Sequence, residues 1–114
     1  MPRRPAQKVG DCYEAAGKYI LAHPGDGLKL VHAEVMGQGP IAGTTFGHAF
    51  VLDGDIVIDK SNGRNLQMSS AVYFALGQIN DIDNFFIYSE KEMLLKITEF
   101  QHWGPWDLVT ASGL

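Results

Sequence analysis

The stretch FGHAFVLDGDIVID, residues 46–59, decides the fold that we expect for this chain. Two apolar runs flank Asp53 and Gly54, and an Asp-Gly pair between apolar runs is the strongest short-range signal of a β-hairpin. With these two residues as the loop of a type I′ turn, His48 lies directly opposite Asp59, with Cβ atoms roughly 5 Å apart. Because both faces of the hairpin are apolar, we expect it at the centre of a sheet that other elements cover on both sides.

The flanking segments show helical and strand patterns and predict an α+β domain. Apolar residues at helical spacing indicate helices, and short runs rich in Val, Ile, Leu and Phe indicate strands. In chain order we expect a helix over 12–22, a strand over 28–36, a Gly/Pro-rich loop over 37–43, the hairpin, a polar turn over 60–67, a short helix over 70–76, a strand over 84–88 and a helix over 90–102. Ser69 is expected to cap the short helix, and Ser89 with Glu92 forms a capping box for the last one.

Length and composition point to one domain over residues 1–114. A chain of 114 residues has room for one hydrophobic core. Its formal net charge of −4 argues against a nucleic-acid-binding surface, which is usually basic. No apolar stretch has the length that a signal peptide or a membrane span needs. A lone cysteine rules out an internal disulfide and suits a reducing compartment, so we expect a cytoplasmic protein that binds neither nucleic acid nor membrane, with its oligomeric state open.

The lone cysteine, Cys12, occupies the first turn of the predicted N-terminal helix. In the segment GDCYEAA, residues 10–16, Asp11 is placed to cap free backbone N–H groups at the helix start. The helix dipole and the unpaired amides stabilise a thiolate at this position. Cys12 is therefore a candidate nucleophile. The alternative is a small buried core residue, which is the commoner role of a lone cysteine.

His48 and Asp59 complete a candidate catalytic triad with Cys12. A cysteine hydrolase or acyltransferase needs a thiolate, an imidazole that accepts and returns a proton, and a group that holds the imidazole in one tautomer. In the predicted hairpin, Asp59 orients the His48 ring. The alternatives are a core imidazole bonded to a backbone carbonyl for His48 and an ordinary turn-starting residue for Asp59, in which case Asn62 becomes the orienting candidate.

Other residues are candidates for the surroundings of this site. The Cys12 backbone N–H and the Gln7 side chain are candidate donors of an oxyanion hole. Gly47 leaves room for a substrate beside the neighbouring imidazole. His32, on the preceding strand, and Trp103, in the C-terminal segment, are candidates for lining the cleft, although a lid on the core is the favoured role for Trp103.

A zinc site is the other chemistry that these residue types allow. Cys12, His32, His48 and Asp59 together offer four potential ligands. They lack the closely spaced ligand pairs of common zinc motifs, so we expect neither a metal nor another cofactor.

The arrangement resembles the papain-like superfamily, in particular its compact transglutaminase-like and NlpC-like members. Those proteins share a cysteine at the start of a helix that packs on an antiparallel sheet, a histidine on one strand and a polar residue on the next. Here the matching segments are DCY at residues 11–13, GHAFV at 47–51 and VID at 57–59. Phe50 stands where the family usually has tryptophan, and the rest of the chain is similar to small bacterial and phage proteins.

This resemblance implies a papain-like fold and a cysteine-dependent amide or isopeptide hydrolase or acyltransferase. Such an enzyme forms a thioester with a peptide or protein amide substrate and needs no cofactor. The alternative is a non-catalytic binding or host-interaction module that keeps the fold, because folds outlive their functions.

Overall fold

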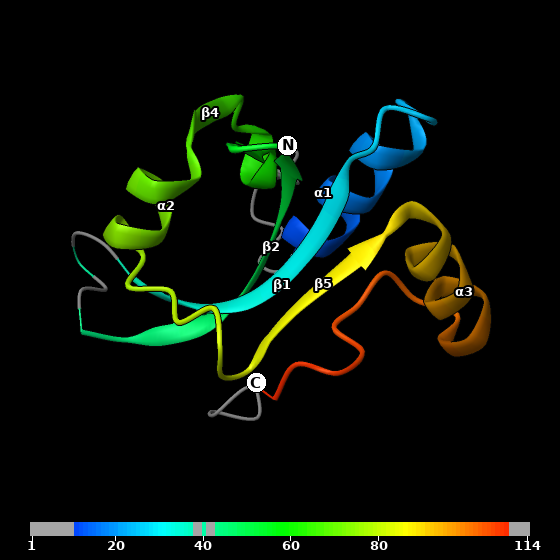
Figure 1. Ribbon diagram of the computed structural model, residues 1–114. Coiled ribbons are helices and arrows are strands. Elements are labelled where there is room, and N and C mark those ends of the chain that lie inside the picture. The colour runs from blue at the N-terminus through cyan, green and yellow to red at the C-terminus, as the bar shows by residue number, and fades with distance from the viewer. Residues whose placement is uncertain (1–10, 38–39, 41–42, 110–114) are drawn as a thin grey trace, which may run out of the picture.

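The computed structural model describes residues 11–37, 40 and 43–109. Within these residues the chain forms a five-stranded antiparallel sheet with the strand order β4-β3-β2-β1-β5, three α-helices and the 3-10 helix η3 (Figure 1). The elements in chain order are α1 (Cys12–Leu21), β1 (Lys29–Met36), β2 (Thr45–Asp53), β3 (Ile56–Asp59), η3 (Ser61–Gly63), β4 (Leu66–Ser69), α2 (Ser70–Leu76), β5 (Phe85–Ser89) and α3 (Glu90–Phe100). The predicted α+β class is confirmed.

Most predicted elements are present, with ends within two residues of those expected. Ser69 accepts a hydrogen bond from the Val72 N–H at the start of α2, and Ser89 and Glu92 form both bonds of the capping box of α3. The predicted polar turn over 60–67 is wrong in part, because residues 66–69 form β4. This strand alternates half-buried and exposed residues at the edge of the sheet, and such a short amphipathic strand carries a weak signal in sequence.

The hairpin of β2 and β3 is present, but its predicted register and turn type are wrong. Val51 pairs with Ile58, so the two loop residues are Gly54 and Asp55 instead of Asp53 and Gly54. Gly54 has a φ of 61°, and among the described residues Asp55 does not have a positive φ. A positive φ at the first loop position alone is the pattern of a type II′ turn, which favours glycine there.

The observed register keeps apolar residues paired across the hairpin. Leu52 lies opposite Val57, whereas the predicted register would have placed it opposite the charged Asp55. Moving the loop by one residue shifts the pairing by two positions, so every side chain keeps its predicted face of the sheet. His48 and Asp59 therefore share a face, as diagonal neighbours rather than as directly opposed residues.

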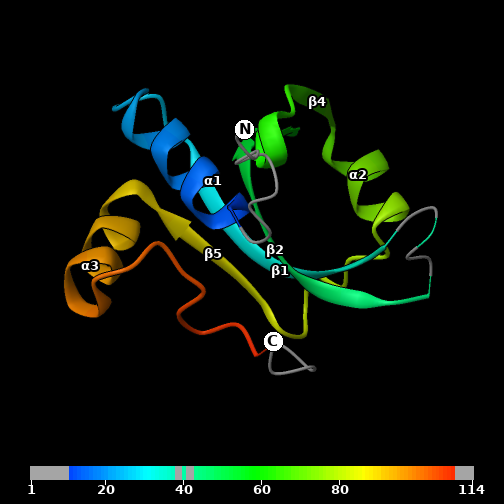
Figure 2. The same cartoon turned by 180° about the vertical axis from the view of Figure 1, so that it is seen from behind.

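Helices cover both faces of the sheet, which confirms the expected central position of the hairpin. Figures 1 and 2 show α1 behind the sheet in one view and in front of it in the other. The core on the side of α1 and α3 contains Cys12, Tyr13, Ala16, Ile20, Leu28, Leu30, Ala49, Val51, Ile58, Tyr88 and Met93. The smaller core on the side of α2 contains Val31, Ala33, Phe50 and Val57, with Tyr73 and Phe74 of α2 packed against it.

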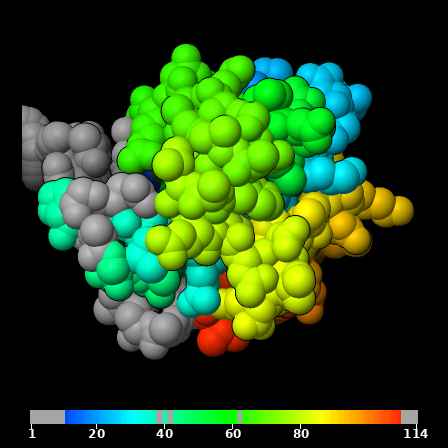
Figure 3. Space-filling model, turned by 60° about the vertical axis from the view of Figure 1, so that its left-hand side comes forward, coloured from blue at the N-terminus to red at the C-terminus, as the bar shows by residue number. Residues whose placement is uncertain are grey.

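The outer elements are attached by a few specific contacts. None of the residues of α2 is fully buried, and Val72 and Leu76 are more than half exposed. The region of α2 forms part of the surface that Figure 3 shows. The C-terminal segment runs beside β5 (Figure 2), where Asp107 accepts a hydrogen bond from the Tyr88 hydroxyl at 2.6 Å. In the described part of the chain, no helix combines the length and apolar character that a membrane crossing requires.

Candidate active site

The His48 ring and the Asp59 carboxylate are joined by a hydrogen bond, as the sequence predicts. The Nε2 atom of His48 lies 3.0 Å from Oδ2 of Asp59. Asp59 is the last residue of β3 and is fully buried, whereas the side chain of His48, on β2, keeps 12% of its surface exposed. Residues Val51–Asp53 of β2 pair with β3. His48 precedes this paired region of the strand.

The Asp59 carboxylate accepts hydrogen bonds at both oxygens. The backbone N–H and the hydroxyl of Ser61 donate to Oδ1 at 2.9 and 2.7 Å. The Tyr73 hydroxyl donates to Oδ2 at 2.8 Å, and Nη1 of Arg64 lies 3.9 Å from the same oxygen. Burial by itself would raise the pKa of Asp59, but the hydrogen bonds from His48 and Ser61 outweigh it and hold this pKa well below its ordinary value. The carboxylate is therefore ionised and fixed in place.

Cys12 approaches the other side of the His48 ring from the first residue of α1. Its thiol is free and buried, with 6% of the residue exposed, and it lies close enough to the His48 side chain to raise the pKa of that ring. Since Nε2 of the ring is bonded to Asp59, Nδ1 is the nitrogen that remains for the thiol. The His48 ring therefore interacts with both Cys12 and Asp59.

The surroundings favour the charged form of the His48 ring. Burial lowers the pKa of His48, but the hydrogen bonds with Asp59 and Cys12 and the negative charges of these groups raise it more, from 6.5 to about 9. At neutral pH the ring is therefore an imidazolium. An imidazolium beside a thiol stabilises the thiolate, which is the nucleophilic form of cysteine.

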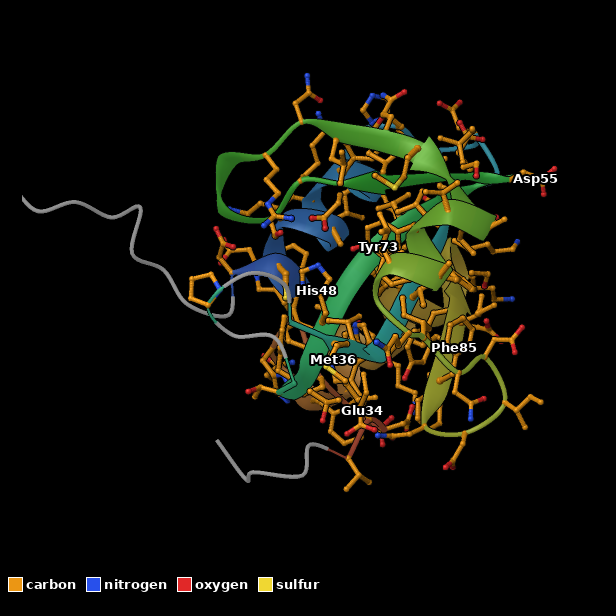
Figure 4. All side chains as sticks on the ribbon, turned by 90° about the vertical axis from the view of Figure 1, so that its left-hand side faces the viewer. Glu34, Met36, His48, Asp55, Tyr73 and Phe85 are labelled. Atoms are coloured by element: carbon orange, nitrogen blue, oxygen red, sulfur yellow. The ribbon has the colours of Figure 1, made fainter. Side chains whose placement is uncertain are left out.

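The site draws on elements from both faces of the sheet. Cys12 belongs to the core under α1, while Tyr73 belongs to α2 on the opposite face. In Figure 4, His48 and Tyr73 lie close to each other between these two helices. The two layers meet here because β3 ends at Asp59, and η3, which contacts α1, follows in its place.

His32 does not line a cleft, and this prediction is wrong. Its side chain is fully buried on the face of the sheet opposite to His48, because β1 pairs His48 with Ala33 and the faces alternate along a strand. The ring lies against those of Tyr13, Tyr88 and Trp106, with centroids 4.9, 5.1 and 4.9 Å away. Burial lowers the pKa of His32 to about 3, although the nearby Asp107 opposes the shift. The ring is therefore neutral.

The other two cleft candidates have different positions. Gly47 is adjacent to His48 on β2 and is partly exposed, and its role in leaving room for a substrate stays a prediction. Trp103 covers the middle of α1, where a Cβ added to Gly17 would come within 2.6 Å of the indole ring. The packing of Trp103 against the core matches the alternative interpretation, a lid on the core, rather than a cleft wall.

The prediction that the Asp11 side chain caps the helix that begins at Cys12 is also wrong. Asp11 precedes α1, but within the described residues its side chain makes no capping hydrogen bond to the first turn, and it is the Asp11 backbone carbonyl that accepts from the Ala15 N–H at 2.8 Å. Of the remaining candidates, Gln7 lies outside the described residues. Asn62 belongs to η3, and its side chain is likewise outside the part that the structure describes.

Ser61 and Tyr73 belong to the site, although the sequence analysis did not include them. Ser61 follows Asp59 by two residues, the spacing at which an Asp side chain bonds to the backbone in a turn, so a local signal was present. Tyr73 lies fourteen residues away from Asp59 along the chain, and no local pattern links the two. Within the described residues, no group of three or more His, Cys, Asp or Glu side chains is arranged to hold a metal ion.

Comparisons of the chain with models of protein families, with curated proteins and with solved structures gave no match. The functional argument therefore rests on the geometry of the site.

Proposed function

We propose that this chain is a cysteine-dependent amide or isopeptide hydrolase or acyltransferase that works through a thioester. The observation that carries the proposal is the position of the His48 ring, which is hydrogen-bonded to the buried Asp59 carboxylate and lies close enough to the Cys12 thiol for the two groups to affect each other's charge. The three residues come from two strands and a helix, and they have the roles that this chemistry requires.

The reaction follows from the protonation states. The Cys12 thiolate attacks the carbonyl carbon of the amide and forms a C–S bond, and the carbonyl electrons move onto oxygen. When the tetrahedral intermediate collapses, the C–N bond breaks and the leaving amine takes a proton from the His48 imidazolium. The thioester then reacts with water or with a second amine, which gives its proton back to His48 as the C–S bond breaks and the Cys12 thiolate is restored. Asp59 holds the ring throughout.

The fold is consistent with the proposed papain-like type. The cysteine begins a helix that packs on an antiparallel sheet, the histidine lies on one strand of that sheet, and the aspartate ends the next. These are the features on which the resemblance rests. A free thiol that takes part in catalysis also suits the reducing cytoplasm.

Thiol alkylation tests the proposal without a known substrate. A Cys12 thiolate paired with His48 should react with iodoacetamide at a pH well below the range in which an ordinary thiol does. His48→Ala should move the rate–pH profile to that ordinary range, and Cys12→Ala should abolish labelling. Mass spectrometry with an electrophilic amide probe then identifies the acylated residue. Identical profiles for the wild type and His48→Ala would contradict the proposal.

The burial of Cys12 is the observation that favours the alternative, a non-catalytic binding module. With 6% of the residue exposed, the sulfur has little access to solvent. A shallow groove between the loop after α1 and the start of α3, lined by Leu28, Lys29, Ser89, Lys91 and Leu94 among others, contains none of the triad residues. A binding module predicts that Cys12 reacts only after unfolding, so alkylation measured with and without denaturant distinguishes the two functions.

A further inference from the structure

Tyr73 shares an oxygen of Asp59 with His48. The hydroxyl of Tyr73 lies 2.8 Å from Oδ2, and Nε2 of His48 lies 3.0 Å from the same atom. The second oxygen, Oδ1, accepts hydrogen bonds from the backbone N–H and the hydroxyl of Ser61. Since the bonds from Ser61 hold Oδ1, the Tyr73 hydroxyl acts on the other oxygen, Oδ2, and reduces the negative charge that this oxygen presents to His48.

We propose that Tyr73 is a positioning residue of the candidate active site. It acts through Asp59, because its hydrogen bond weakens the attraction of this carboxylate for the His48 proton. A donor on Oδ2 takes up part of the negative charge that the imidazolium would otherwise meet. A less strongly stabilised imidazolium is a stronger acid, and a general acid works best when its pKa lies near the working pH. The proposal rests on the proposed function, because it concerns the acid step of that reaction.

The groups that face this pair come from every neighbouring element. Cys12 on α1 contacts His48, Tyr73 comes from α2, and Arg64, after η3, places Nη1 3.9 Å from Oδ2 of Asp59. Arg64 is largely exposed, so solvent screens its charge. Among the described residues, Tyr73 is therefore the hydrogen-bond donor to Oδ2, besides His48, that solvent screens less.

The test is the substitution Tyr73→Phe, which removes the hydroxyl and keeps the ring in the core under α2. We expect the His48 pKa, followed by NMR of the ring, to rise by roughly 0.5–1 pH unit, a change within the reach of one charge-assisted hydrogen bond. The pH range over which the rate of Cys12 alkylation rises should move to lower pH by a similar amount. In an Asp59→Asn background, Tyr73→Phe should cause no further shift, because the carboxylate is gone.

Tyr88→Phe is the matched control. Tyr88 is likewise a tyrosine that donates to a carboxylate, Asp107, at 2.6 Å, but it is buried in the core under α1 and α3. Both substitutions should lower thermal stability, and only Tyr73→Phe should change the titration of His48. A His48 titration that is unchanged or moves to lower pH in folded Tyr73→Phe would overturn the proposal.

The wild-type protein provides a measurement that needs no variant. Burial, the charge of Asp59 and the hydrogen bond to it raise the pKa of Tyr73 far above its ordinary value. Its hydroxyl should therefore stay protonated through pH 11 in an NMR titration. Titration near the ordinary value of about 10 would show that the bond is absent and would overturn the proposal even if Tyr73→Phe did not fold. If His48→Ala leaves the alkylation profile unchanged, the proposed function itself fails, which is a separate outcome.

Discussion

Asp59 accepts a hydrogen bond from the His48 ring at 3.0 Å while its own side chain is removed from solvent. An ionised carboxylate in such a place needs partners for both oxygens, and Ser61 and Tyr73 provide the others. The carboxylate therefore has two separable effects, on the charge of His48 and on the stability of the fold.

Asp59→Asn should reduce both effects. An amide carries no charge, so the His48 pKa should fall and the rate of Cys12 alkylation near neutral pH should drop by roughly tenfold or more. The amide nitrogen also cannot accept the hydrogen bonds that one carboxylate oxygen accepted, which should cost about 1–3 kcal/mol of unfolding free energy. Rate–pH profiles and urea denaturation measure the two effects.

Asn62→Ala is the control for this experiment, because Asn62 is the other orienting candidate. Its alkylation profile should match that of the wild type. If Asp59→Asn matches the wild type and Asn62→Ala is shifted, the orienting role belongs to Asn62; if all three profiles coincide, neither residue orients the ring.

Cys12→Ala and His48→Ala should each abolish amidase or acyl-transfer activity on any substrate that the wild type turns over. The nucleophile and the base act as one unit, so the double variant should be no less active than either single one. Both proteins should remain folded by circular dichroism. Unchanged turnover in Cys12→Ala would remove the nucleophile assignment, and unfolding of that variant would favour a structural role for the cysteine.

His32 should make the fold sensitive to acid. Among the described residues, neither ring nitrogen of His32 has a hydrogen-bond partner. Its pKa is about 3 in the folded protein and 6.5 in the unfolded chain, so between these values the unfolded state binds a proton that the folded state does not. The free energy of unfolding should therefore decrease as the pH falls from 6.5 towards 3, by up to about 1.4 kcal/mol per pH unit.

Urea denaturation at pH 6.5 and 4.5 tests this effect, with His32→Leu as the comparison. The pKa of His48 is raised by folding, so its contribution to the free energy of unfolding is fully present below pH 6.5. The pKa of Asp59 is lowered, so its contribution is lost only below pH 3.8. Neither contribution varies much between pH 6.5 and 4.5. The wild type should lose stability between the two pH values, and His32→Leu should lose less. Equal losses in the two proteins would show that His32 is not the source.

Gly17→Ala should destabilise the protein although alanine favours helices by about 1 kcal/mol over glycine. The new Cβ would lie 2.6 and 2.8 Å from two atoms of the Trp103 ring, which must move from its place on α1. We expect a net loss of about 1–3 kcal/mol in unfolding free energy, the usual cost of overpacking. In a Trp103→Ala background the same substitution should instead be neutral or stabilising. A loss of stability in that background would show that the new Cβ clashes with a residue other than Trp103.

Local patterns in the sequence determined the elements of this protein and indicated the residues of its candidate active site. The capping box of Ser89 and Glu92, the cap at Ser69 and the apolar runs around Gly54 all act over a few residues, so they can be recognised without the fold. The face shared by His48 and Asp59 was also predictable, since alternation along a strand survives an error of two positions in the pairing.

Only the tertiary structure decided the register, the contact of Tyr73 with Asp59 and the separation of the two histidines. The register follows from pairing Leu52 with Val57. Tyr73 reaches Asp59 because α2 packs on the face opposite to α1 and β3 ends between them. His32 is enclosed by aromatic rings from α1, β5 and the C-terminal segment. These contacts join residues far apart in the chain, and their energies depend on which side chains the packing brings together rather than on any local preference.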